Sequence, residues 1–407
     1  MSILSMAIRN IKRSRHRTWV TVFAMGFAGF FMILYASLME GFVETSEQNA
    51  IGMELGDIQL HAPGFRSDPD LYKRIDDHEE VLAALQTTGY QAAPRLFGGG
   101  LAAAGVASAG VQVRGVDLAR EAQVTRISHH ILEGVWLDDS APSEVVIGRK
   151  LAAILGVGVG DEIVFVGQAA DGAMANELYR VRGILKTVGA AVDTAGFFMT
   201  AEAFRQLMAM PDGAHEIVVK LGSDSVEVGE AAKTLAARFP DLEVKSWREL
   251  APVVARIIDT SNISLVIMLL ITYVAVGILT LNAMLMSVFE RIREFGVMKA
   301  LGLPPWHIFL LIVLEALIQV VLAVILALVT GVPLSLYFED HPIDLSALAA
   351  SSTSVAGIAI DPVWASKLTL MGVVLPMVYL AVIAGLAIIY PGGKAALIRP
   401  VEALRHR

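Results

Sequence analysis

Four stretches of this 407-residue chain are long and apolar enough to cross a membrane, and they restrict its fold more than any other feature. A hydrocarbon core of about 30 Å takes roughly 20 helical residues. Windows of that length, each with at most one charged residue, cover 18–40, 260–289, 308–338 and 368–390. A mean hydropathy of +0.61 with only 18% charged residues agrees. The sequence therefore predicts an α-helical membrane protein with four transmembrane helices.

The basic residues beside the spans predict the orientation, because lysine and arginine are retained on the cytoplasmic side. They gather before the first span, between the second and third, and after the last: Arg9, Lys12, Arg13, Arg15, Arg17; Arg291, Arg293, Lys299; Lys394, Arg399, Arg405, Arg407. Loop 339–367 has one lysine and four acids instead. We therefore expect both termini in the cytoplasm, with 1–17 as an amphipathic helix and 391–407 as a tail. No small-residue cleavage site follows the first span, so we expect it to be a permanent anchor.

Residues 41–259 are then expected outside, as a large extracytoplasmic α+β domain inserted between the first two spans. Alternating strand and helix signals divide this domain into two subdomains. Two β-α-β units, at about 45–109 and 205–250, are expected to pack together next to the membrane. Between them, 110–204 is expected to be a β-rich insertion. The second span has 30 uncharged residues, roughly 45 Å of helix, and is expected to project as a stalk.

The sequence contains no catalytic motif. It has no cysteine, which excludes thiolate metal sites and cysteine nucleophiles, and no P-loop for nucleotide phosphates. His215 and Glu216 would begin a zinc-protease helix, but Val219 stands where the second histidine is needed. A net charge of −8 argues against nucleic-acid binding. We therefore expect no catalytic residue, metal or cofactor on this chain.

Glu315 is the one ionisable side chain well inside a predicted span, about 10 Å along the helix from Ile308. Ionisable groups inside a membrane are rare and mark functional sites by default. The alternative is a structural partner for basic groups near the cytoplasmic side. The sequence leaves both roles open.

The segment that joins the second and third spans, 290–307, is expected to form a short cytoplasmic helix. Four apolar residues recur at three-residue spacing and form a ridge: Ile292, Phe295, Met298 and Leu301. Gly302 and the two prolines that follow end the helix. An apolar ridge with charged flanks is what a groove on a partner can bind. A loop that merely reverses the chain is the alternative.

Several segments resemble the FtsX-like, MacB-type permeases of ABC systems. They are "AIRNIKRSRHRTWVT" near the start, "VVIGRKLAAILGVGVGDEI", "ERIREFGVMKALGLPPWHI", and "YPGGKAALIRPVEALR" near the end. The resemblance implies a non-catalytic permease of the bacterial inner membrane, with a periplasmic domain. It also implies a second permease, identical or paralogous, and a separate ATPase subunit that carries the ATP and Mg. The residues that it assigns to an ATPase-coupling helix are Arg291, Arg293, Glu294, Phe295, Gly296, Met298, Lys299, Leu301 and Gly302.

Within that family the order and size of the segments are most similar to the LolC/LolE-type permeases, which implies release of lipoproteins to a periplasmic carrier. An acyl chain would then enter between the first two spans, against Phe23, Phe27, Phe30, Leu34, Met268 and Tyr273. The loop 167–178 would dock the carrier through Gly167, Gln168, Asp171, Met174 and Asn176. This loop is shorter than in that subfamily and has no proline. The alternatives are MacB-like efflux or envelope export with an adaptor, and FtsX-like regulation of a cell-wall hydrolase.

Overall fold

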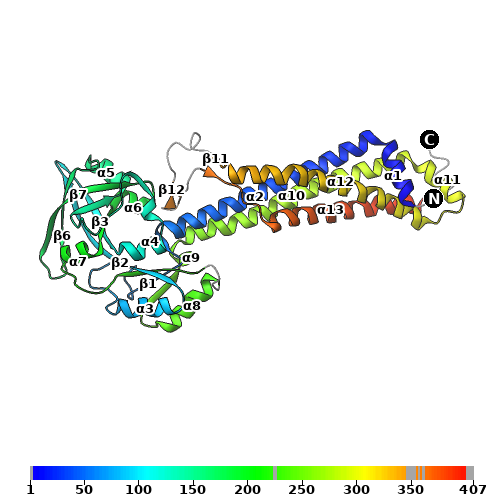
Figure 1. The fold of residues 1–407 in the computed structure, drawn as a ribbon. Helices are drawn as coiled ribbons and strands as arrows, with labels where there is room; N and C mark the ends of the chain where they lie inside the picture. Colours follow the sequence, from blue (N-terminus) through cyan, green and yellow to red (C-terminus); the bar gives the residue numbers. More distant parts are fainter. Residues whose placement is uncertain (1–2, 223–226, 345–353, 356–357, 360–362, 400–407) are drawn as a thin grey trace. The chain divides into compact units, whose positions relative to one another are not determined.

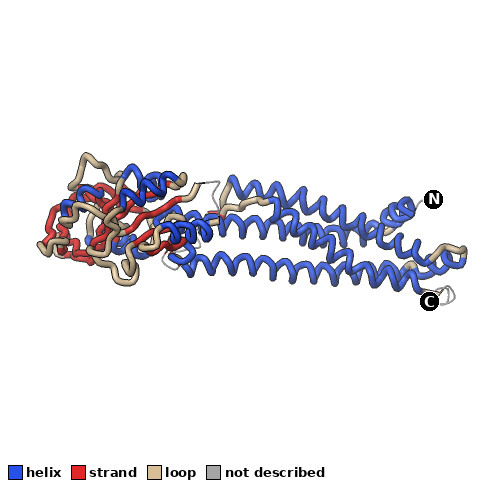
Figure 2. Tube along the Cα trace, turned by 90° about the horizontal axis from the view of Figure 1, so that it is seen from below, coloured by secondary structure: helices blue, strands red, loops and turns tan. Residues whose placement is uncertain are grey.

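The computed structural model describes residues 3–222, 227–344, 354–355, 358–359 and 363–399, and the chain divides into two compact units. We call the first the membrane unit; it comprises Met1–Glu44, Asp259–Leu345 and Val363–Arg407. The second, the sheet unit, comprises Thr45–Ile258 and Ser346–Pro362. Figure 2 shows that the long helices belong to the former, while the large sheet lies in the latter.

Four long helices run side by side in the membrane unit (Figure 1). Its helices are α1 (Ile3–Arg13), α2 (Arg15–Ala50), α10 (Pro252–Glu290), α11 (Ile292–Ala300), α12 (Pro305–Asp340) and α13 (Leu370–Leu397). By length and composition α2, α10, α12 and α13 can each cross a membrane, which confirms the predicted number of spans. The 39 residues of α10 extend over roughly 58 Å, about twice the thickness of a hydrocarbon core.

The first span differs from its predicted end. Helix α2 continues through Ala50, and a π-helical turn, η1 (Ile51–Leu55), follows it. The expected start of the extracytoplasmic domain at residue 41 therefore falls inside a helix. The apolar window ends at Glu40, but α2 continues for ten more residues. A change from apolar to polar residues marks the end of a membrane span and does not by itself end a helix.

Two clusters of buried side chains hold the membrane unit together. One joins α2, α10, α12 and α13 and includes Met25, Met32, Leu269, Tyr273, Val320, Ala323 and Leu380. The other lies around α1 and α11 and includes Ala7, Met284, Phe295, Ile308, Leu311, Ala316 and Ile388. The amphipathic helix α1 is thus packed against α12 by its Ala7 side, while Leu4 and Ile8 stay exposed.

The predicted loop 339–367 lies partly outside the described residues. Near its two ends β11 (Ile343–Asp344) pairs with β14 (Val363–Trp364). Between them in the sequence, β12 (Ser354–Val355) pairs with β13 (Ile358–Ala359). Trp364 contacts Phe42 of α2 with the rings tilted by 55° and their centroids 5.6 Å apart. Lys367 forms an ion pair with Glu44, and the hydrogen bond that Lys367 donates to this carboxylate raises the pKa of Lys367.

The sheet unit contains one ten-stranded sheet. Its strands are β1 (Ile58–His61), β2 (Gln91–Ala104), β3 (Ala107–Val116), β4 (Ile131–Gly134), β5 (Glu144–Ile147), β6 (Glu162–Gln168), β7 (Met174–Leu185), β8 (Gly196–Thr200), β9 (Glu216–Lys220) and β10 (Glu243–Ser246). Its helices are α3 (His78–Thr87), α4 (Leu118–Val124), η2 (Ile127–His129), α5 (Arg149–Leu155), α6 (Ala190–Ala195), α7 (Ala201–Leu207), α8 (Val228–Arg238) and α9 (Trp247–Leu250).

The two β-α-β units read from the sequence lie in one part of this sheet. Strands β1, β2, β9 and β10 are ordered β10-β1-β9-β2, and every neighbouring pair is antiparallel. Helices α3 and α8 supply the apolar residues that cover it, among them Val81, Leu85, Ala231 and Leu235. This is a β-α-β-β-α-β arrangement.

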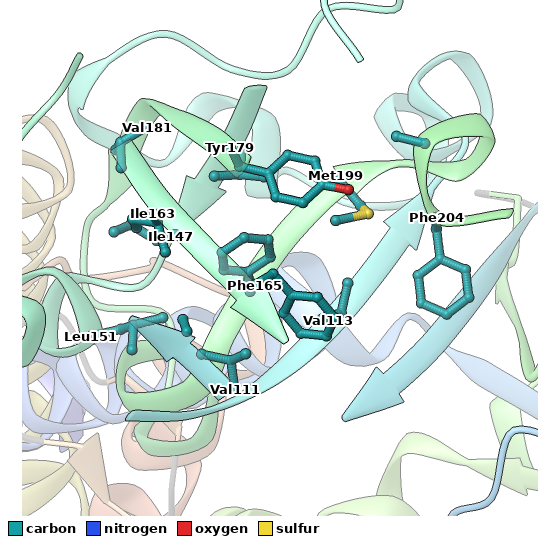
Figure 3. Packing of buried hydrophobic residues seen from close by; sticks show 14 of the residues in the cluster. Val111, Val113, Ile147, Leu151, Ile163, Phe165, Tyr179, Val181, Met199 and Phe204 are labelled. Carbon is teal, nitrogen blue, oxygen red and sulfur yellow. The ribbon is translucent and has the colours of Figure 1, made fainter. Parts of the chain in front are cut away.

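The predicted β-rich insertion is a closed six-stranded barrel. Strand β2 pairs with β3, then β8, β5, β7 and β6 follow, and β6 pairs with β2 again. Alternate residues of these strands fill the interior, as Figure 3 shows: Val111, Val113, Ile147, Ile163, Phe165, Tyr179, Val181 and Met199. Gly100 is required at this closure, because a Cβ there would lie 2.4 Å from the Phe165 ring.

The expected boundary between the subdomains at 109/110 is therefore wrong. It falls inside β3, and β2 belongs to both parts. The first residues of β2 pair with β9, and its last residues pair with β6. A strand of 14 residues is long enough to pair in both parts of the sheet. No change in the alternating sequence pattern marks the point where β2 passes from one part to the other.

Candidate coupling site

The short helix α11 connects α10 to α12, and its ends are defined by specific residues. Arg291 is the single residue between α10 and α11. At the other end, the amide nitrogens of Gly302 and Leu303 donate to the carbonyls of Lys299 and Met298, at 3.0 Å each. Gly302 has φ of +95°, a left-handed conformation that glycine adopts most easily and that ends helices. The predicted coupling segment thus contains a helix with a defined C-terminal cap.

The predicted apolar ridge mostly faces the protein rather than a partner. Phe295 is 1% exposed and Ile292 is 6% exposed, and Met298 packs against the same cluster as Phe295. Of the four ridge residues, Leu301 is exposed. The expectation that a partner binds the ridge is therefore wrong for Ile292 and Phe295. Their spacing marks the side of α11 that packs on α1, α10 and α12.

Another set of residues, which we call the outward face, is open to the surroundings. It consists of Arg293, Val297, Leu301 and Trp306. The exposed fractions are 47% for Val297, 84% for Leu301 and 65% for Trp306. Sequence reasoning missed Val297 and Trp306. The signal for Val297 was present, since residues 293, 297 and 301 follow four-residue spacing along one side of a helix.

Charged side chains fasten α11 at both ends. Arg291 Nη1 donates to both carboxylate oxygens of Glu315 at 2.9 Å, and Arg13 of α1 pairs with Glu294 at 3.0 Å. At the far end, Lys299 Nζ donates to the carbonyl of Ile398 at 2.7 Å and to that of Ala396. Burial lowers the pKa of Lys299. Gly296, like Phe295, is buried.

The residues expected to contact substrate do not share one environment. Phe23 is 55% exposed and Phe27 is 66% exposed, whereas Phe30, Leu34 and Met268 are half-buried. Tyr273 is only 2% exposed and packs between helices. The expectation that Tyr273 faces substrate is therefore wrong in this structure. Its aromatic ring lies in the core between the membrane helices. Because this helix is apolar on all sides, the spacing of its apolar residues cannot show which of them face the core and which face lipid.

The expected carrier loop 167–178 is mostly strand. Gly167 and Gln168 end β6, while Met174 and Asn176 belong to β7, so that Asp171 lies in the five-residue turn 169–173. Two hydrogen bonds hold this turn. The Tyr72 hydroxyl donates to the Ala170 carbonyl at 2.9 Å, and the Ala170 amide donates to the Met208 carbonyl at 2.9 Å. Met174 is nevertheless 76% exposed. Gln168 lines a cavity of about 560 Å³ that also contains Phe65 and Phe97.

The sheet unit holds a buried charged cluster that sequence reasoning missed. Arg95 donates to Glu121 at 2.6 Å, to Glu216 at 2.9 Å and to the Glu54 carbonyl at 2.6 Å. Burial alone lowers the pKa of Arg95, but the two carboxylates raise it above its usual value. Burial raises the pKa of Glu216, but its hydrogen bond to His61 and the charge of Arg95 outweigh this and bring it to about 2.

His215 lies beside this cluster as a buried neutral base. Its Nδ1 accepts from the Phe97 amide at 3.0 Å, so the ring proton must be on Nε2, which lies 3.2 Å from the Leu71 carbonyl. Burial lowers the pKa of His215 to about 4. Within the residues described above, no group of three or more histidine or acidic side chains has the arrangement of a metal site.

Two family models match this chain. Residues 18–237 match the MacB-like periplasmic core domain, and residues 266–391 match the C-terminal part of the FtsX-like permeases. With four helices of membrane-crossing length, these matches define a multi-pass membrane permease with an extracytoplasmic domain. The chain belongs to the FtsX/MacB family of ABC transporter permeases. It is a non-catalytic transmembrane subunit of that family, which implies a partner ATPase.

Individual relatives are distant. An uncharacterized ABC transporter permease of Methanocaldococcus jannaschii is 28% identical over 286 residues, which cover 68% of this chain and 66% of that protein. The lipoprotein-releasing system transmembrane protein LolC of Xylella fastidiosa is 24% identical over 311 residues, 72% of each chain. The solved periplasmic region of MacB from Actinobacillus actinomycetemcomitans superposes with a TM-score of 0.37 and 14% identity, over 51% of this chain and 95% of that one.

Proposed function

We propose that this chain is the permease half of an ABC transporter that releases lipidated proteins from the outer leaflet of a bacterial inner membrane. A separate ATPase subunit binds ATP and Mg and drives movement of the sheet unit, which lies on the periplasmic side. Two permeases, identical or paralogous, act together. Both termini lie in the cytoplasm, as the basic residues beside the spans indicate.

The outward face of α11 is the observation that carries this proposal. Val297 of α11, Leu301 just after it and Trp306 at the start of α12 are exposed, as is Arg293. Helix α11 is tied to α12 by Arg291 and to α13 by Lys299. An exposed apolar surface on a rigid helix is suited to a groove on a partner protein. Force applied there passes to two membrane helices rather than to a loose loop.

Two observations support lipidated proteins as the cargo. The similarity to LolC extends over 72% of this chain, which is more than either unit alone comprises, so it includes parts of both units. In addition, Phe23 and Phe27 of α2 are exposed and can contact an acyl chain or a membrane lipid. The short turn at 169–173 and the exposed Met174 are then the surface offered to a periplasmic carrier.

The test is reconstitution of the permease in proteoliposomes with its ATPase and a radiolabelled lipoprotein. We expect ATP-dependent release of lipoprotein, and loss of release for Leu301→Asp. Drug-stimulated ATP hydrolysis without lipoprotein release would favour MacB-like export instead. Activation of a cell-wall hydrolase without release would favour an FtsX-like regulator. Photo-crosslinkers at Phe27 and Phe23 should label lipoprotein; labelling of lipid alone would contradict the cargo.

A further inference from the structure

Glu315 joins three separate elements near one end of the membrane unit. Its side chain is 9% exposed and lies in α12. Both carboxylate oxygens accept from Arg291, which stands between α10 and α11, at 2.9 Å. One of them also accepts from Asn10 of α1 at 2.6 Å. A single buried carboxylate thus fixes the position of both short helices against a long one.

Arg291 is the connection between α10 and α11, so its conformation sets the direction of α11 relative to α10. No other residue separates the two helices. Its guanidinium lies 5.1 Å from the centroid of the Phe295 ring, and its Nε donates to Glu294 at 3.2 Å. Glu294 in turn pairs with Arg13 of α1 at 3.0 Å. Holding Arg291 therefore also holds the inner side of α11.

An apolar side chain at position 315 would pack more simply in this part of α12, where Leu311, Ile312 and Ala316 are buried. Buried ion pairs are seldom more stabilising than well-packed apolar residues of the same volume. Their best-attested use is to fix one arrangement among several. The pair also borders a cavity of about 240 Å³ lined by Asn10, Arg13, Ser14, Glu290, Arg291 and Glu294, so the packing alone leaves room for movement.

We infer that Glu315 is a positioning residue: it locks α11 and α1 to α12, so that displacement of α11 moves α12 instead of bending the connection at Arg291. The inference rests on the proposed function for the source of that displacement. The lock itself is a property of this chain alone. It can therefore be tested with and without an ATPase.

The first arm measures a distance in the full-length permease in nanodiscs. The chain has no native cysteine, so spin labels can be placed at Val297 and Leu317, which are 47% and 48% exposed. We expect a narrow distance distribution in the parent and a clearly broader one in Glu315→Gln, which keeps the volume but not the charge. Asn10→Ala should broaden it less. Gln319→Leu, one turn further along α12, is the matched control and should leave it unchanged.

The second arm adds the ATPase and measures lipoprotein released per ATP hydrolysed. We expect Glu315→Gln to lower this ratio about tenfold, within the range typical of coupling between sites, while ATP hydrolysis continues. An unchanged distance distribution in Glu315→Gln would overturn the lock. A broadened distribution with an unchanged ratio would overturn its role in transmission. If the parent releases no cargo at all, the proposed function fails, and the distance arm still decides the lock.

Discussion

Two arginines, one in each unit, illustrate different uses of the same buried chemistry. Arg95 in the sheet unit and Arg291 in the membrane unit each bind two carboxylates from different elements. Around Arg95 all three side chains are at most 9% exposed. Around Arg291 the exposed fraction rises to 16% for the arginine and 41% for Glu294. The first cluster is sealed, whereas the second opens on a polar cavity.

This difference separates stability from transmission. A sealed cluster cannot exchange its partners without exposing unpaired charges, so Arg95 holds η1, α4, β2 and β9 in one arrangement. The half-open cluster can exchange a surface carboxylate for water at little energetic cost. Arg291 is therefore suited to a part of the molecule that must move with a partner, and Arg95 to a part that moves as a body.

The largest expected effect is on the sealed cluster. Arg95→Met leaves Glu121 and Glu216 buried without their cation, which should reduce the free energy of unfolding of the sheet unit by about 3–5 kcal/mol. Hydrogen exchange of the β2 and β9 amides in the full-length chain measures this. Arg120→Met is the control, because Arg120 pairs with Glu79 on the surface and such pairs contribute about 1 kcal/mol or less. Equal effects of the two variants would contradict the comparison.

Acid should weaken the sheet unit. The pKa of His215 is about 4 when folded and about 6.5 when unfolded, so the unfolded chain takes up a proton between these values and the folded one does not. The free energy of unfolding should therefore fall by about 3 kcal/mol as the pH drops from 6.5 to 4. Below pH 4.5 the loss continues, because the pKa of Glu216 is about 2.

Thermal unfolding followed across this pH range, with hydrogen exchange to assign the unit, checks the expectation. His215→Gln can still accept from the Phe97 amide but does not titrate, so its stability between pH 6.5 and 4.5 should be nearly flat. An equally steep pH dependence in this variant would show that another group is responsible.

The two sides of α11 should respond differently to the same change. Val297→Asp on the outward face should weaken ATPase association about tenfold, or about 1.4 kcal/mol, with little effect on the stability of the permease. Phe295→Asp buries an unpaired carboxylate, and Gly296→Pro breaks the helix. Both should abolish transport while leaving membrane insertion intact. Pull-down of the ATPase and protease protection measure these outcomes. If Val297→Asp leaves ATPase binding unchanged, the ATPase does not bind the outward face.

The smallest effect is expected at the open edge of the Arg291 cluster. Glu294→Gln removes the pair with Arg13, whose side chain is 78% exposed, and should change stability by about 0.5 kcal/mol or less. Glu315→Gln should exceed it clearly in the same thermal assay. A Glu294 effect as large as that of Glu315 would mean that the cluster acts as one unit rather than as a buried lock with a surface rim.

Local sequence patterns were sufficient for the spans and for the two β-α-β units, since apolarity and periodicity are properties of neighbouring residues. The barrel was seen only as a β-rich insertion, because its closure depends on β2 meeting β6, about sixty residues later. Arg95 was missed for the same reason: Glu54, Glu121 and Glu216 reach it from distant positions. In α11 the three-residue spacing identified an apolar side correctly but could not tell whether that side faces inward.

The central claim is that a partner ATPase binds the outward face of α11, and cysteine cross-linking tests it most directly. Single cysteines at Arg293, Val297 and Leu301, introduced into a chain that has none, should cross-link to the ATPase in the assembled complex. Cysteines at the buried Ile292 and Phe295 should not. Cross-links from the buried pair, or from exposed positions in the sheet unit but not from the outward face, would contradict the account.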